Sequence, residues 1–120
     1  MDPKEALELL DSSEGWIGVI FEGTLSQPLA IDAPLYSLGA PIESGIAVVK
    51  SMLSKGFKVQ IISQYISPYC WRRKEHRDRT LSRQAFEEWC LEYIGEYVFC
   101  TNSINDETQA IFLNDQIVRI

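Results

Sequence analysis

The sequence predicts one α/β domain: a three-layer sandwich whose mainly parallel sheet is flanked by helices. Two runs, 16–21 (WIGVIF) and 57–63 (FKVQIIS), are rich in β-branched and aromatic residues. They lack strict polar alternation, which is typical of strands buried on both faces. A helical pattern over 42–55 separates them, and further helical and strand patterns follow in alternation. The 120 residues allow one domain to bury roughly two thirds of its unfolded surface.

The remaining elements follow from local signals. Asp2 and Pro3 suit the start of a helix that we expect to run to Asp11 within an N-terminal unit, 1–14. Residues 24–41 contain three prolines and one glycine, and this composition predicts a loop insertion. Glycines close the predicted helices. In chain order we expect the strand 16–21 at the sheet centre, the helix 42–55, the strand 57–63, a helix from about 80 to 94, and short strands at 97–100, 110–113 and, at the edge, 117–120.

Composition excludes several protein classes. A chain with 46% hydrophobic and 23% charged residues is not disordered or collagen-like. It has no apolar run near the ~20 residues of a membrane span, and its acidic first residues do not resemble a signal peptide. We therefore expect a cytoplasmic protein without a membrane partner. Cys70, Cys90 and Cys100 form no CxxC pair, so we expect reduced thiols.

Charge is distributed unevenly. Six basic and two acidic residues give 66–83 a net charge of +4, which leaves −10 for the rest of a chain whose total is −6. The acidic body makes nucleic acid an improbable partner, although aromatic and basic side chains can stack on single strands. The basic/aromatic segment 64–79 has the composition of protein-binding hot spots and predicts a partner with an acidic surface. An ordinary exposed loop, which would include His76, is the alternative. The candidate binding residues are Tyr65, Tyr69, Trp71, Arg72, Arg73, Lys74, Arg77 and Arg79.

Small, polar or acidic residues follow the predicted strands. In a parallel sheet, ligands bind outside the carboxyl ends of the strands. Glu22, Asn114 and Asp115 are candidate ligands for Mg²⁺, and the Ser63 hydroxyl is a candidate for binding an anion. The alternatives are ordinary ones: a solvated strand end for Glu22, a loop cap for Ser63, and a turn at 114–115.

The order of these motifs resembles that of the haloacid dehalogenase-like (HAD) phosphohydrolases. The run 16–24 (WIGVIFEGT) is similar to the family's first motif, a strand that ends in Asp-x-Asp-Gly-Thr. Residues 55–63 (KGFKVQIIS) resemble the next unit, in which a strand ends in Ser or Thr. Residues 112–115 (FLND) resemble the last motif, a strand that ends in paired acids. The resemblance covers 16–120 and implies a Rossmann-like sheet in a small member without a large cap domain.

This chain departs from the family pattern where the chemistry is done. Ile20 occupies the position of the nucleophilic Asp, and an alkyl group cannot attack phosphorus. Glu22 replaces the general acid, whereas Thr24 and Ser63 match the pattern. No lysine follows Lys74, and the final acid pair is reduced to Asn114 and Asp115.

Three losses in one catalytic unit predict a catalytically degenerate domain that acts as a binding or regulatory module without a cofactor. Ile20 then serves as core packing. The alternative is a weak Mg²⁺-dependent phosphatase or hydrolase that uses Glu22, Asp115 and Ser63. The apolar stretch at 117–120 leaves an edge through which a homodimer can form.

Overall fold

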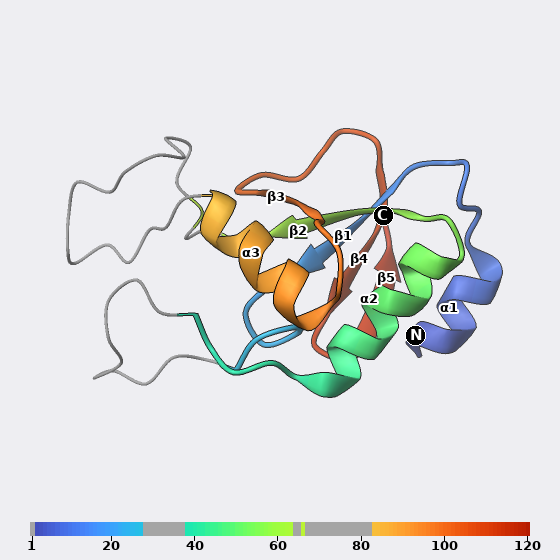
Figure 1. The fold of residues 1–120 in the computed structure, drawn as a ribbon. Helices are drawn as coiled ribbons and strands as arrows, with labels where there is room; N and C mark the ends of the chain where they lie inside the picture. Colours follow the sequence, from blue (N-terminus) through green and yellow to red (C-terminus); the bar gives the residue numbers. More distant parts are fainter. Residues whose placement is uncertain (1, 28–37, 64–65, 67–82) are drawn as a thin grey trace.

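The computed structural model describes residues 2–27, 38–63, 66 and 83–120 and contains an α/β fold (Figure 1). Its sheet has five strands in the order β3-β2-β1-β4-β5, so the strand that begins at Trp16 is central, as predicted. No large cap domain is present in the described part of the chain. The elements are α1 (Pro3–Leu9), β1 (Trp16–Ile20), α2 (Glu43–Ser54), β2 (Lys58–Ile62), α3 (Arg83–Tyr93), β3 (Phe99–Thr101), β4 (Thr108–Leu113) and β5 (Gln116–Arg119).

The sheet is mixed, and the expectation of a mainly parallel sheet was wrong. β1 pairs in parallel with β2 and β4, and β2 pairs in parallel with β3, but β4 and β5 are antiparallel. The reason is the connection between β4 and β5, which consists of Asn114 and Asp115 alone. Two residues can reverse the chain into a hairpin but cannot return it to the start of a parallel strand.

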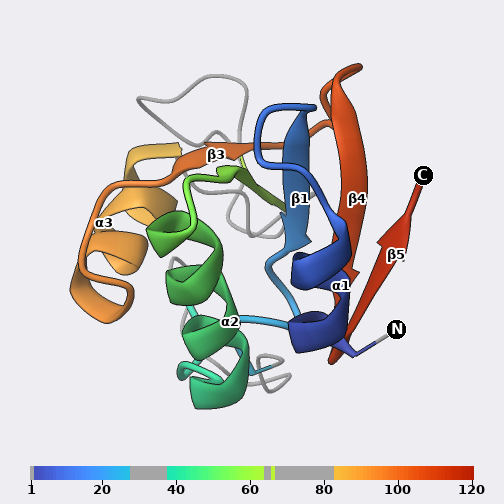
Figure 2. The same ribbon diagram turned by 90° about the vertical axis from the view of Figure 1, so that its right-hand side faces the viewer.

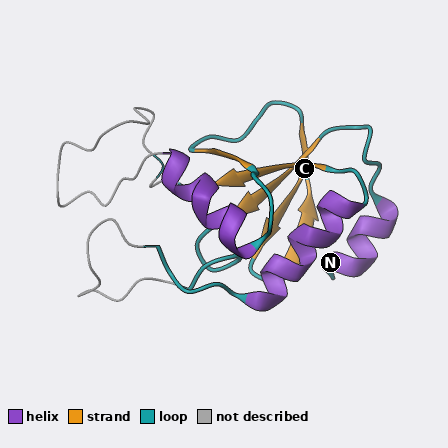
Figure 3. Cartoon of the chain, viewed as in Figure 1, coloured by secondary structure: helices purple, strands orange, loops and turns teal. Residues whose placement is uncertain are grey.

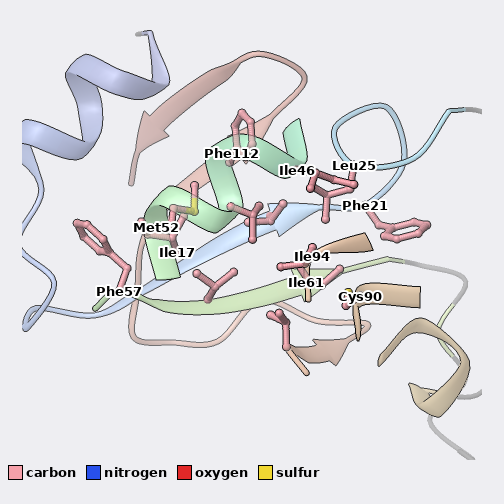
Figure 4. Packing of buried hydrophobic residues seen from close by; sticks show 14 of the residues in the cluster. Ile17, Phe21, Leu25, Ile46, Met52, Phe57, Ile61, Cys90, Ile94 and Phe112 are labelled. Carbon is pink, nitrogen blue, oxygen red and sulfur yellow. The ribbon is translucent and has the colours of Figure 1, made fainter. Parts of the chain in front are cut away.

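One face of the sheet carries the hydrophobic core. Ile17 and Val19 of β1 are fully buried there, as are Ile61 of β2 and Phe112 of β4 at 1% exposure or less. Side chains from all three helices join them in one cluster, part of which is drawn in Figure 4. α2 packs on β2, α3 packs on β3, and α1 packs on α2 and β5. The strand side chains on this face are therefore buried by the helices that pack on them.

The described helices all lie on that same side of the sheet (Figures 2 and 3). A strand–helix–strand crossover is right-handed, so α2 and α3, which both lead toward the β3 edge, are placed on one face. The chain returns from β3 to β4 through residues 102–107, a connection too short for a helix. The described residues therefore form two layers, and the expected third layer is not found among them.

The return connection is attached to the sheet on the face opposite the helices. Gln60 of β2, only 3% exposed, donates from Nε2 to the Ser103 carbonyl at 3.5 Å and accepts from the Asn105 N–H at 3.3 Å. On the same face, a Cβ at Gly18 would lie 2.7 Å from Ile62 Cδ1 and 2.8 Å from Ile111 Cδ1. The loop and the isoleucines cover the middle of this face, on which none of the described helices lies.

Most element boundaries differ from the sequence-based ones by a few residues. α1 begins at Pro3 with the Asp2 carboxylate accepting from Lys4 N–H at 2.8 Å, and it ends before the predicted Asp11. The predicted reduced cysteines Cys90 and Cys100 are fully buried thiols, whereas Cys70 lies outside the described residues. None of the described helices has the length and apolar composition needed to cross a bilayer.

Candidate functional site

Three neighbouring strands of the sheet, β2, β1 and β4, end at the same edge, because they run parallel. Their ends are followed by the residues that sequence analysis selected: Ser63 after β2, Glu22 and Thr24 after β1, and Asn114 and Asp115 after β4. The fold therefore brings the candidate residues to one edge, although Glu22 and Asp115 are 93 positions apart in the chain.

A tight turn after β1 sets the position of Glu22 and Thr24. The Phe21 carbonyl accepts from the N–H groups of Leu25 at 3.0 Å and Ser26 at 3.1 Å. Gly23 adopts φ +82°, a left-handed conformation that suits glycine. The turn packs against the first turn of α2, where a Cβ at Gly45 would collide with the Thr24 carbonyl oxygen. A glycine at position 45 is therefore required for this close approach of helix and turn.

Glu22 and Ser63 are joined by a short hydrogen bond. The Ser63 hydroxyl donates to Glu22 Oε2 across 2.6 Å, which links the ends of β1 and β2. Ser63 is only 2% exposed, whereas Glu22 is half-buried. Hydrogen bonds to a carboxylate are among the stronger ones in proteins. The predicted anion-binding hydroxyl is thus directed at a carboxylate of its own chain.

Thr24 and Asn114 form the corresponding link between β1 and β4. The Asn114 N–H donates to Thr24 Oγ1 at 2.8 Å, and Thr24 is fully buried. Asn114 has φ +57° in the two-residue turn between β4 and β5. Asparagine tolerates this left-handed conformation better than most residues. The turn interpretation of Asn114 and Asp115 therefore agrees with the structure, and the buried contact of Thr24 is one that sequence reasoning missed.

Ile20 does not belong to the main core, contrary to our expectation. It is half-buried and lies outside the helix-side cluster. Its neighbour Val19 points to the helices, and successive strand residues point to opposite faces. Ile20 therefore presents a hydrocarbon side chain on the opposite face, which carries none of the described helices and is called here the face without helices, in register with Ile62.

The donor atoms at this edge do not fit a magnesium site. Mg²⁺ favours carboxylate and phosphate oxygens in octahedral geometry. Glu22 already accepts from Ser63, Ile20 offers no donor atom, and Asn114 Oδ1 lies against the turn after β1, where a Cβ at Gly23 would be 3.2 Å from it. In the described ranges, no three or more His, Cys, Asp or Glu side chains are grouped to hold a metal. The described residues at this edge therefore do not fit a metal-dependent reaction.

The basic/aromatic segment 64–79 lies outside the described residues except for Ile66. Ile66 is buried and its N–H donates to the Ser63 carbonyl at 3.2 Å. The candidate residues of this segment are Tyr65, Tyr69, Trp71, Arg72, Arg73, Lys74, Arg77 and Arg79, together with His76, and their structural environment is not described. The chain enters the segment directly beside the Glu22–Ser63 pair.

No family model, curated protein or solved structure matches this chain. The functional assignment therefore depends on the residues at the strand ends and on charge. Two hydrogen bonds, Glu22–Ser63 and Thr24–Asn114, connect the residues that follow neighbouring strands at this edge.

Proposed function

We propose that this chain is a catalytically degenerate HAD-like domain that works as a protein-binding or regulatory module. The observation that carries the proposal is the set of side chains that follow β1 and β2, where the polar groups bond to each other. The Ser63 hydroxyl is buried against the Glu22 carboxylate at 2.6 Å. The neighbouring position that would have to supply a nucleophilic oxygen holds the alkyl side chain of Ile20.

The internal hydrogen bonds support a structural role for these polar residues. Thr24 is fully buried and accepts from the Asn114 amide, and Ser63 is nearly as buried. A phosphate ligand would have to displace the Glu22 carboxylate from Ser63 and would then lie beside a negative charge. Like charges in contact repel each other, so anion binding at this edge is disfavoured.

The basic/aromatic segment supplies the interaction chemistry. It carries a charge opposite to that of the rest of the chain, and it is connected to the sheet at Ser63 and at α3. Arginine and aromatic side chains are enriched among the residues that dominate protein interfaces. We propose that its partner is a protein with an acidic surface.

One observation favours a second candidate, a weak Mg²⁺-dependent hydrolase. A carboxylate within 2.6 Å of a hydroxyl is the arrangement by which a base activates a nucleophile or a water molecule. In that case Glu22 accepts a proton and Asp115 contributes a second carboxylate. The poor donor set for a metal makes this the less favoured proposal.

Hydrolysis of an aryl phosphate distinguishes the two. We expect no turnover above the buffer rate with or without Mg²⁺, and no change in Glu22→Gln. Ser63→Ala serves as the companion variant, since it removes the hydroxyl but leaves the carboxylate. Turnover that requires Mg²⁺ and disappears in both variants would establish the hydrolase and overturn the binding module.

Binding is tested with polyglutamate as a defined acidic polypeptide. Replacing Arg72 and Arg73 by Ser is expected to weaken binding at least about tenfold, because two charge-pairing groups are lost. The matched control replaces two exposed lysines by Ser, Lys50 of α2 and Lys55 directly after it, which removes the same charge elsewhere. Equal losses in both double variants would show only a general charge effect and contradict the proposal. Tighter binding of single-stranded DNA than of polyglutamate would instead identify a nucleic-acid partner.

A further inference from the structure

β5 forms an edge of the sheet, and the direction of its backbone groups can be assigned. The Ile120 N–H donates to the Gln109 carbonyl at 3.0 Å, so this amide points inward to β4. In an antiparallel strand, the N–H and C=O of one residue point to the same side, and this side alternates along the chain. The backbone N–H and C=O of Val118 therefore also point toward β4. The backbone groups of Ile117 and Arg119 point away from the sheet.

We propose that β5 pairs with β5 of a second copy of this chain, antiparallel, around a two-fold axis at Val118. Ile117 of each copy then faces Arg119 of the other. Both outward N–H groups and both outward C=O groups of each copy are used, which gives four hydrogen bonds between the chains. One short strand supplies both sides of the contact, as a closed two-fold interface requires.

The side chains of β5 suit this arrangement. Ile117 is buried in the helix-side core, so the alternating Val118 and Ile120 lie on the face without helices. They are 58% and 77% exposed, high values for apolar residues on a strand. At the two-fold axis the two Val118 residues form a non-hydrogen-bonded pair, in which Cα atoms approach to about 4.5 Å. The apolar surface of each strand is thereby covered by its equivalent.

Charge also favours a second copy as the occupant. Arg119 is the charged residue of β5, and in the proposed register it faces Ile117 and not the other Arg119. It lies on the same side of the sheet as the helices, because it is two residues from Ile117. On that side α1 packs against β5 and exposes two acidic residues, Glu5 and Glu8, against one basic residue, Lys4. Each Arg119 is therefore brought to an acidic side of the other copy.

The strand also lacks the features that block edge pairing. Residues 114–120 contain no proline and no lysine, and the irregularity in the sheet lies between β1 and β4 rather than at β5. Both proline and bulges are common protections of exposed edges. The strand is short, however, and a stable interface covers about 800 Å² on each partner. A weak dimer that depends on concentration is therefore expected.

Sedimentation equilibrium over a concentration series tests the proposal. The mass should rise from 13.7 kDa toward twice that value and no further. Val118→Lys places two like charges at the two-fold axis and should weaken dimerisation at least about tenfold. The matched control is Tyr97→Lys, which adds the same charge at a 66% exposed position before β3, at the opposite edge. Circular dichroism of both variants shows whether they fold.

Amide exchange at low and high protein concentration gives a second readout that does not depend on a variant. The amides of Ile117 and Arg119 should become protected as concentration rises. The amides of Val118 and Ile120 should be protected at all concentrations, because they bond to β4. A chain that stays monomeric, a dimer equally weakened by Tyr97→Lys, a mass beyond two copies, or no alternation in amide protection would each overturn the proposal.

Discussion

The two faces of the sheet are covered in different ways. On the helix side, Ile17, Val19 and Ile61 are completely buried beneath three helices. On the other side, Ile20 and Ile111 are half-buried, and Leu113 is 44% exposed. The strands also place more polar residues on this second side, where Lys58, Gln60 and Gln109 lie. The connections add to the difference: a long connection can form a helix and cover a face, whereas the short one from β3 to β4 cannot.

The largest contrast is expected between matched isoleucines on the two faces. Ile61→Ala should lower the free energy of unfolding by about 3–4 kcal/mol, since it leaves a cavity in the core. Ile20→Ala should cost about 1 kcal/mol, because Ile20 is half-buried and the space it leaves opens to solvent. Urea denaturation measures both. Equal losses would show that the face without helices is a core in its own right.

Two glycines give the next contrast. Gly45→Ala should destabilise the protein by about 2 kcal/mol, because its Cβ would meet the backbone carbonyl of Thr24, which cannot move away easily. This reverses the gain of roughly 1 kcal/mol that helix propensity alone predicts. Gly18→Ala should cost less than about 1 kcal/mol, since its Cβ would meet the ends of two isoleucine side chains. Thermal unfolding of the two variants tests the order, and stabilisation by Gly45→Ala would contradict the observed approach of α2 to the turn.

A smaller effect is expected at the loop that crosses the face without helices. Gln60→Ala removes two long hydrogen bonds to this loop and should change global stability by less than about 1 kcal/mol. Amide exchange at Asn105 should nevertheless become faster, because its acceptor is lost. Unchanged exchange at Asn105 would mean that the loop is held by other contacts. Gln109→Ala is a control, since Gln109 bonds to the turn before β1 instead.

The smallest effect concerns the turn that joins α1 to β1 on the helix side. Hydrogen bonds from the Ser13 N–H and hydroxyl lower the pKa of Asp11 from its ordinary value of 3.8. A lowered pKa stabilises the fold above pH 3.8, and this contribution is lost as the pH falls through the folded-state value. Asp11→Asn should therefore reduce the pH dependence of stability below pH 3.8. Its effect on the free energy of unfolding should add to the effects of the core variants. A steeper dependence in Asp11→Asn would contradict this assignment.

Much of the fold could be predicted from the sequence. The apolar runs that begin at Trp16 and Phe57 identified two of the three inner strands, β1 and β2, and Gly56 and Gly95 marked the ends of helices. The parallel assumption failed at β5, although the signal was present: Asn114 and Asp115 form a two-residue connection that requires a hairpin. A third layer is not found among the described residues, and apolar strands look alike in sequence whether a helix or a loop covers them.

The candidate site was predictable in position but not in detail. Parallel pairing alone places Glu22 and Ser63 at one edge of the sheet, so their proximity follows from topology. Which atoms bond depends on side-chain direction, which the sequence does not reveal. The link from Asn114 to the hydroxyl of Thr24 is therefore visible only in the structure. The proposal of a degenerate site depends on residue identity at position 20, which the sequence does reveal.

The partnership of β1 with β4 has a consequence for biosynthesis. Trp16 of β1 pairs with Thr108 of β4, so β1 cannot complete its pairing until β4 has been synthesised. During translation β1 has β2 on one flank and an unpaired flank on the other, which invites contacts with neighbouring nascent chains. Chaperone dependence should consequently be greatest just before β4 (Thr108–Leu113) leaves the ribosome.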